Sequence, residues 1–293
     1  MKLLVIYNPA AGLKRRDELQ IIIKYLTENN FDYEVHKTQV DFGPDEILAS
    51  SEHKVDVIIV AGGDGTVSQS INAVHKYGWA CPILLLPLGT TNEISQNLGQ
   101  NTSNLISQLE KLKTMNTISL DYGLVNNSKT FTYALTFGNF TEVTYKTPQK
   151  MKNWLGYRAY ILYGFLTFRK IKKYRVHINS DEASLGGNYV FGAVSNSSSM
   201  GNIFHYNDDK ISLTDGLFEV LLISKPNSVK ELRLILTGMM QNDYSNEMFT
   251  TFKSRDLIIK TKQDIDWNID GEYGGSYKKL EIENKRQSIQ LII

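Results

Sequence analysis

The chain has 293 residues, the length of about two ordinary domains. Its 32 basic and 31 acidic side chains nearly cancel, which argues against a surface built throughout for nucleic acid, and we expect no nucleic-acid partner. Hydrophobic residues make up 42% of the chain, which excludes a disordered protein. The single cysteine, Cys81, excludes an intrachain disulfide and a zinc site built from cysteines, so we expect a reducing, cytoplasmic setting.

Short apolar runs alternate with helix-length polar segments in the first third of the chain. The expected strands are residues 3–7, 33–37, 55–60, 83–86 and 117–120, and the expected helices are residues 15–29, 44–51, 67–76, 92–98 and 102–112. The run from Val57 to Val60 is apolar without alternation, which is typical of a strand covered on both faces. This order predicts an α/β domain with an open, mostly parallel sheet over residues 1–124.

The pattern changes after about Tyr122, where short alternating stretches are separated by turn residues. The expected strands are residues 130–136, 175–179, 189–195, 218–223, 256–260, 264–269, 279–282 and 288–292, with helices near 154–171 and 229–240. We therefore expect a mainly antiparallel β-sandwich domain over residues 125–293. The sequence leaves open whether the extreme C-terminus packs back on the first domain.

The clearest chemical motif is Gly62-Gly63-Asp64-Gly65-Thr66, directly after a predicted strand and before a helix. Glycines allow the backbone to approach a ligand closely, and a helix start offers unpaired N–H groups to phosphate. Asp64 would repel a phosphate, so its presence indicates a divalent metal or a hydroxyl between the two. The alternative is a tight strand–helix turn in which Asp64 caps the helix.

Two more turns follow predicted strands: Asn8-Pro9-Ala10-Ala11-Gly12, and the turn from Pro87 to Glu93. Ligands of open α/β sheets bind outside the carboxyl ends of the strands, where all three turns converge. Each turn alone is weak evidence, because such residues also form ordinary turns. Together they supply backbone amides, the hydroxyls of Thr66, Thr90 and Thr91, and the amides of Asn8 and Asn92, a set that suits a nucleotide.

These three motifs resemble the soluble diacylglycerol kinase catalytic family. The resemblance continues through the stretch Asp215–Val220 and through Asn268–Glu272, so it spans nearly the whole chain. Tyr145–Pro148 and Asp270–Gly275 are most similar to the Gram-positive diacylglycerol kinases. The resemblance implies transfer of the γ-phosphate of MgATP to a lipid hydroxyl, with diacylglycerol as the family default and the nucleotide in an interdomain cleft.

The family's functional positions carry over one at a time. The implied nucleotide-binding residues are Asn8, Pro9, Gly12, Gly62, Gly63, Asp64, Gly65, Thr66, Gly89, Thr90, Thr91 and Asn92. The implied ligands of the nucleotide's Mg²⁺ are Asp64, Glu93 and Asp121, and those of a structural Mg²⁺ are Ser212, Asp215 and Leu217. Glu93 stands where the family usually has aspartate, and Gln69 stands where it usually has glutamate.

Asp270 matches the family's proposed general base, and Glu272 its companion. A primary alcohol is a poor nucleophile, and a positioned carboxylate can accept its proton as the bond to phosphorus forms. Without the resemblance, the same residues would be interpreted as an ordinary β-turn, because Asp-Gly is a strong hairpin signal.

The segment Lys150–Arg175 combines aromatic and basic residues. Its apolar side chains recur at helical spacing, and no acid occurs between Glu142 and Asp181. Such a helix fits contact with an anionic membrane surface, which predicts a peripheral membrane association and a lipid substrate taken at that surface. The alternative is a helix packed on the β domain with a solvated basic end. A homodimer is also implied by the resemblance.

Two other functions remain open from the sequence. An NAD kinase shares the glycine motif, but Thr90-Thr91-Asn92 and the basic aromatic segment favour the lipid enzyme. A nucleotide- or lipid-binding protein with weakened catalysis is suggested by Gln69 and Glu93.

Overall fold

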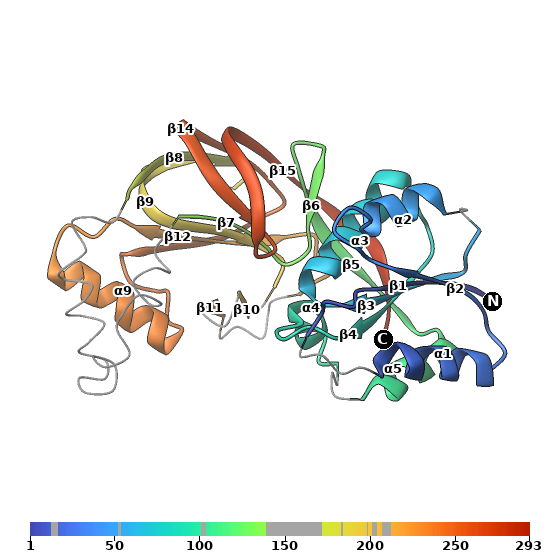
Figure 1. The fold of residues 1–293 in the computed structure, drawn as a ribbon. Helices are drawn as coiled ribbons and strands as arrows, with labels where there is room; N and C mark the ends of the chain where they lie inside the picture. Colours follow the sequence, from blue (N-terminus) through green and yellow to red (C-terminus); the bar gives the residue numbers. More distant parts are fainter. Residues whose placement is uncertain are drawn as a thin grey trace. The chain divides into compact units, whose positions relative to one another are not determined.

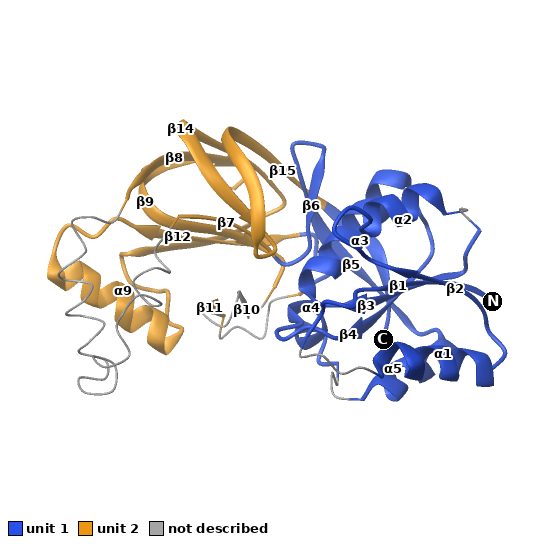
Figure 2. Cartoon of the chain, in the orientation of Figure 1, with its two compact units in different colours: residues 1–133, 213–216, 285–293 blue, residues 134–212, 217–284 orange. Residues whose placement is uncertain are grey.

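The computed structural model describes residues 1–12, 17–51, 54–100, 104–138, 172–182, 184–197, 199–200, 204–206 and 212–293. These residues form two compact units, each made of more than one segment (Figure 2). Unit 1 is Met1–Tyr133, Leu213–Gly216 and Lys285–Ile293, and unit 2 is Ala134–Ser212 and Leu217–Asn284. Among the described residues, no helix has the length and apolar character needed to cross a bilayer.

Unit 1 contains a parallel sheet with helices on both faces, as the sequence predicts (Figure 1). Its strands pair in the order β2-β1-β3-β4, and the end of β15 pairs with β4. The strands are β1 (Lys2–Tyr7), β2 (Asp32–Lys37), β3 (Val57–Gly62), β4 (Ile83–Pro87) and β15 (Glu272–Ile292). The helices are α1 (Glu18–Glu28), α2 (Pro44–Ser50), α3 (Asp64–Tyr77), α4 (Glu93–Asn97) and α5 (Leu105–Thr114).

The two faces of this sheet form separate hydrophobic cores. Alternate residues of β1 point to opposite faces, so Leu4 packs with the α2 and α3 side, and Leu3 with the α1 and α5 side. All six residues of β3 are buried, which explains its uninterrupted apolar run.

A hairpin extends unit 1 beyond the boundary that we expected at residues 124–125. It is formed by β5 (Thr117–Val125) and β6 (Lys129–Phe131). Thr130 donates to Asn72 Oδ1 on α3 through its backbone N at 3.1 Å and its hydroxyl at 3.3 Å. Because these bonds fix the hairpin to α3, the expected boundary lies inside β5 and unit 1 continues to Tyr133.

The C-terminal residues also belong to unit 1. Leu291 pairs with Ile83 of β4, and the backbone N of Ile293 donates to the carbonyl of Asn116 at 2.9 Å. Leu291 and Ile292 are fully buried, one in each core of the unit.

Unit 2 is built on antiparallel strands with one long described helix. The longer strands are β7 (Ala134–Gly138), β8 (Tyr174–Ser180), β9 (Ser184–Ser195), β12 (Phe218–Ser224), β13 (Phe249–Ser254), β14 (Asp256–Ile269) and the first part of β15. The helix is α9 (Val229–Gln241), and β10 (Ser199–Met200) pairs with β11 (Phe204–His205). The prediction of an antiparallel β domain is confirmed.

The expected sandwich of two sheets is not what the strand pairing shows. Both β7 and β8 pair with β9 and with β14, so these four strands close a ring of continuous hydrogen bonding. This closure is possible because β9 and β14, with 12 and 14 residues, change partner along their length. Several strands that we expected as separate pieces are parts of β14 and β15.

Candidate functional site

The three glycine-containing turns lie together at the carboxyl edge of the unit 1 sheet. The turns follow β1, β3 and β4, as the sequence predicts. The Asn8 amide Nδ2 donates to the Thr66 hydroxyl at 2.8 Å, and the Asn8 backbone N donates to the carbonyl of Ala61 at 2.9 Å. These bonds fix the first turn against the second.

Close backbone contact joins the third turn to the other two. Gly12 has φ +70°, and a Cβ atom on it would lie 2.1 Å from the carbonyl oxygen of Leu88. A Cβ atom on Gly89 would lie 2.6 Å from the Cα atom of Gly63. Only glycine allows backbones to approach this closely. The glycines therefore allow the three turns to pack against one another, in addition to leaving room for a ligand.

Asp64 joins the second and third turns through its carboxylate. Its Oδ2 accepts from the backbone N of Asn92 at 2.9 Å, and its Oδ1 accepts from the backbone N of Glu93 at 2.6 Å. These N–H groups belong to the start of α4, where a carboxylate compensates the positive end of the helix. Asp64 therefore caps the neighbouring helix, whereas the N-cap of its own helix α3 is Gly63.

Asn92 completes this turn from a left-handed backbone conformation. Its φ is +53°, which asparagine tolerates better than most residues. Its side chain accepts from the backbone N of Gly89 and donates to the carbonyl of Gly89, both at 2.9 Å. The turn that carries Thr90 and Thr91 is thereby closed on itself.

The start of α3 is the element of this edge best suited to an anion. Helix α3 has 14 residues, and the first N–H groups of a helix have no partner within it. Gly65 lies at this start and has no side chain to cover it, while Pro9 and Thr90 are exposed on the neighbouring turns. The arrangement can bind phosphate through backbone N–H groups and hydroxyls.

The two positions that depart from the family pattern, Glu93 and Gln69, differ in burial. Glu93 is buried, with 3% of its surface exposed, and Gln69 is exposed on α3. The extra methylene of Glu93 is thus accommodated inside the fold. The neutral Gln69 stands at the surface of unit 1.

Asp121 has hydrogen bonds that favour a structural role over the metal role that we expected. Its Oδ2 accepts from the backbone N of Gly216 at 2.6 Å, and its Oδ1 accepts from the backbone N of Gln287 at 2.7 Å. The residue is 2% exposed, and its own N donates to the carbonyl of Leu213. Charge-assisted bonds of this kind are strong, so Asp121 ties together the three segments of unit 1.

The Asp215 turn is a short segment of unit 1. It includes Gly216, whose φ of +80° fits the expected Asp-Gly turn. Within the described parts of the chain, no three or more His, Cys, Asp or Glu side chains are grouped so as to hold a metal ion. A structural Mg²⁺ on Ser212, Asp215 and Leu217 therefore stays a prediction.

Asp270 is buried in unit 2 and bonded twice to Ala134. Its backbone N donates to the Ala134 carbonyl at 2.9 Å, and its Oδ1 accepts from the Ala134 backbone N at 3.1 Å. Asp270 and Gly271 have φ values of +48° and +88°, and they form the tight turn between β14 and β15. Asn268 supports this turn by accepting from the backbone N of Gly271 at 2.8 Å.

Glu272 lies on the other side of the same turn. It is the first residue of β15 and is exposed, whereas Asp270 is 3% exposed. The two carboxylates therefore do not share one face of a single strand. The sequence offered a hairpin turn and a candidate base as alternatives for these residues. The two are compatible, because the hairpin turn itself positions Asp270.

The sequence did not indicate the partners of these acids. Ala134 contacts Asp270 through its backbone N and O alone, so its role depends on the pairing of β7 with β14 and not on its side chain.

Comparison with known proteins gives the likeness of the whole chain. Residues 2–125 match the family model of the diacylglycerol kinase catalytic domain. Over 92% of its length the chain is 28% identical to a diacylglycerol kinase of Staphylococcus saprophyticus, covering 88% of that protein. It is 26% identical to a diacylglycerol kinase of Bacillus subtilis, covering 89% of that protein.

Solved structures share the fold. A putative diacylglycerol kinase from Bacillus anthracis superposes with a TM-score of 0.79 at 22% identity, over 99% of this chain and 94% of that chain. A second such structure from the same organism gives a TM-score of 0.76 at 21% identity, over 99% and 96% of the two chains. The chain is therefore a kinase, an enzyme that transfers a phosphoryl group. Its residues 2–125 match the diacylglycerol kinase catalytic domain, so the resemblance that the sequence motifs indicated is confirmed.

Proposed function

We propose that this lipid kinase transfers the γ-phosphate of ATP to the hydroxyl of diacylglycerol and forms phosphatidic acid. The proposal rests on the packing of the three turns against one another at the start of α3. The contacts of Asp64, Asn8 and Gly89 hold these turns together. The related diacylglycerol kinases of Staphylococcus saprophyticus and Bacillus subtilis support diacylglycerol as the acceptor.

The phosphates of ATP would bind at the start of α3. Backbone N–H groups near Gly65 and the hydroxyl of Thr90 are available to hold anionic oxygens. Mg²⁺, when bound with the nucleotide, neutralises charge on the β- and γ-phosphates. Asp64 fits that ion, because it is a partly exposed carboxylate beside the start of α3. Asp121, with 2% of its surface exposed, fits it poorly.

Asp270 would accept the proton of the lipid hydroxyl. The new bond joins the hydroxyl oxygen to the γ-phosphorus, and the bond from that phosphorus to the bridging oxygen breaks. The two bonds with Ala134 hold Asp270 in one position, which a general base requires. Glu272 would assist from the exposed side of the turn. That Asp64 and Asp270 meet across one cleft stays a prediction.

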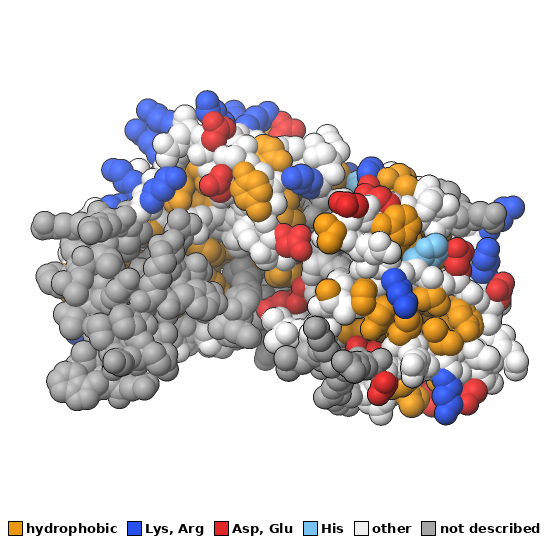
Figure 3. Space-filling view, viewed as in Figure 1, with side chains coloured by type: hydrophobic (Ala, Val, Ile, Leu, Met, Phe, Trp, Pro, Cys, Tyr) orange, Lys and Arg blue, Asp and Glu red, His pale blue; other side chains and the backbone are white. Residues whose placement is uncertain are grey.

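Membrane contact is part of the same proposal. The basic aromatic segment 150–175 lies mostly outside the described residues. The described strands of unit 2 carry further exposed basic residues on β8, β14 and β15, and Figure 3 shows Lys and Arg side chains gathered over these strands. They are Arg175, Lys260, Lys262, Lys278 and Lys279. Lys278 and Lys279 are paired with Asp264 and Glu281, so Arg175, Lys260 and Lys262 are the residues that would attract anionic lipid. The homodimer stays a prediction.

The test is a phosphoryl-transfer assay with purified protein, Mg²⁺ and γ-labelled ATP. Dioleoylglycerol, ceramide and a sphingoid base are presented in mixed micelles, and NAD is offered in solution. We expect label in phosphatidic acid. Label only in another lipid would change the acceptor, and label only in NADP would overturn the lipid kinase. ATP binding by calorimetry without transfer to any acceptor would indicate the weakened, non-catalytic protein.

A further inference from the structure

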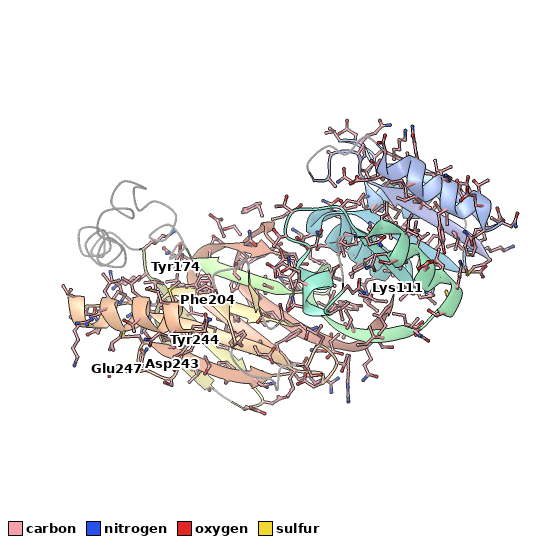
Figure 4. All side chains as sticks on the ribbon, turned by 90° about the horizontal axis from the view of Figure 1, so that it is seen from below. Lys111, Tyr174, Phe204, Asp243, Tyr244 and Glu247 are labelled. Atoms are coloured by element: carbon pink, nitrogen blue, oxygen red, sulfur yellow. The ribbon has the colours of Figure 1, made fainter. Side chains whose placement is uncertain are left out.

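Unit 2 contains a cavity of about 570 Å³ beside the end of α9. The lining residues are Tyr206, Glu219, Val220, Asn242, Asp243, Tyr244, Ser245, Thr251, Phe252 and Lys253. Figure 4 shows Phe204, Tyr244 and Asp243 grouped near this helix, and the rings of Phe204 and Tyr244 lie 6.2 Å apart. The volume is in the range of small-molecule sites, which is about 300–1,000 Å³.

Strand register explains why one wall of the cavity is polar. Glu219 pairs with Ser195 on one side and with Lys253 on the other, so the three side chains point to the same face. Two positions along, Leu221 pairs with Thr251, and Ile223 then pairs with Phe249. The face therefore changes from charged at Glu219 to apolar at Ile223.

Glu219 is a fixed and buried carboxylate. It lies on β12, between β9 and β13, and is 5% exposed. Its Oε1 is 3.0 Å from the Nζ of Lys253. A buried carboxylate requires a cationic or hydrogen-bonding partner, because desolvation of the charge is costly.

Lys253, in contrast, can leave this position. It lies on β13, at the end of the strand order, and its side chain is 33% exposed. A lysine has a long, flexible stem and can carry its ammonium group into water. An incoming ammonium group could then take the same place at Glu219.

The rest of the lining also favours a cation. Asp243 is a second carboxylate, and its hydrogen bonds from Ser245 lower its pKa, so it is ionised at neutral pH. The two carboxylates outnumber the single ammonium of the lining. The rings of Tyr206 and Tyr244 lie 5.8 Å apart in an edge-to-face arrangement, and aromatic rings attract cations. Binding of phosphate is disfavoured, because both carboxylates would repel its negative charge.

We propose that this cavity binds the primary ammonium group of a small amine, which displaces Lys253 from Glu219. Asn242, Ser245 and Thr251 would bond hydroxyl or ester oxygens on the rest of the ligand. Two sources offer this chemistry: a free amino alcohol or diamine, and the headgroup of an aminophospholipid. The proposal is independent of the phosphoryl transfer.

The test uses the full chain and isothermal titration with ethanolamine and with 1,3-diaminopropane. Vesicles of phosphatidylcholine with and without phosphatidylethanolamine test the lipid source by cosedimentation. Glu219→Gln keeps the side-chain volume, and we expect it to weaken amine binding by about tenfold or more, because a charge-assisted bond is lost. Lys253→Met removes the competing ammonium, and we expect tighter amine binding. Lys230→Met changes an exposed lysine on α9 and should bind amines like the wild type.

Amine affinity falls in Glu219→Gln and rises in Lys253→Met only if the cavity is an amine site. Weaker amine binding in Lys253→Met, or binding of inorganic phosphate that depends on Lys253, would overturn the proposal. Failure of every amine probe to bind both the wild type and Lys253→Met would also overturn it. Equal thermal unfolding midpoints of the variants and the wild type show that the fold is retained.

Discussion

Gly63 and Gly89 meet backbone to backbone, since a Cβ atom on Gly89 would lie 2.6 Å from the Cα atom of Gly63. The contact joins the turn after β3 to the turn after β4. The candidate phosphate site therefore depends on the absence of a side chain at Gly89.

Gly89→Ala is expected to separate these two turns. Displacement of the third turn should raise the KM for ATP by about tenfold or more, because catalytic groups tolerate little misplacement. Steady-state kinetics at varied ATP measures this effect. Gly43→Ala is the control, because the nearest atom to its Cβ is 3.5 Å away. An unchanged KM in Gly89→Ala would show that the contact has no part in the site.

Asp121→Asn tests the structural role of this carboxylate. The new amide nitrogen would face one of the N–H groups of Gly216 and Gln287, so we expect a loss of about 1–3 kcal/mol in the free energy of unfolding. Urea unfolding measures the loss, and Asp266→Asn, an exposed change on β14, is the control. If Asp121 instead holds the nucleotide's metal, stability will stay constant and the Mg²⁺ requirement will rise.

His75 is expected to make the stability of the protein pH-dependent. Burial, and then the charge of Lys285, lower the pKa of His75, whose Nδ1 lies 2.6 Å from the Tyr122 hydroxyl. The unfolded chain therefore binds this proton more readily than the folded one. Stability should fall as the pH drops through the ordinary histidine range and further to the lowered pKa.

The free energy of unfolding of the wild type and of His75→Gln, compared from about pH 7.5 to about pH 5, measures this contribution. The variant should lose less stability on acidification. Parallel pH profiles would mean that His75 contributes nothing to the dependence.

Cys81 is expected to react slowly with thiol reagents. Burial raises the pKa of its thiol to about 11, so little thiolate is present at neutral pH. As the only cysteine of the chain, it can be followed with a chromogenic disulfide. At about pH 8 its rate should be at least tenfold below that of the chain unfolded in urea. Equal rates in the two states would contradict the partial burial of this side chain.

The sequence predicted the parts of the fold that follow from local pattern. The apolar run of β3 and the alternation of β8 identified a parallel and an antiparallel region. The rule that ligands bind at the carboxyl ends of parallel strands placed the turns at Asn8, Gly62 and Gly89 on one edge. These expectations needed only residues that are neighbours in sequence.

The remaining features depend on contacts between distant residues. The bonds from Asp64 to the start of α4, and from Asp121 to Gly216 and Gln287, join residues 28 to 166 positions apart. The ring of β7, β9, β8 and β14 depends on strands that change partner. A carboxylate in a motif looks the same in sequence whether it binds a metal or a backbone N–H group, so the hydrogen bonds of Asp121 became visible only in the structure.

The most direct test of the proposed catalysis compares the wild type with Asp270→Asn in the transfer of label from ATP to dioleoylglycerol. Asparagine keeps the size of the side chain and its acceptor toward Ala134, but it cannot accept a proton. We predict that kcat falls by a factor of about 10²–10⁴ with an unchanged unfolding midpoint and unchanged ATP affinity. Full turnover by Asp270→Asn would contradict the assignment of Asp270 as the general base.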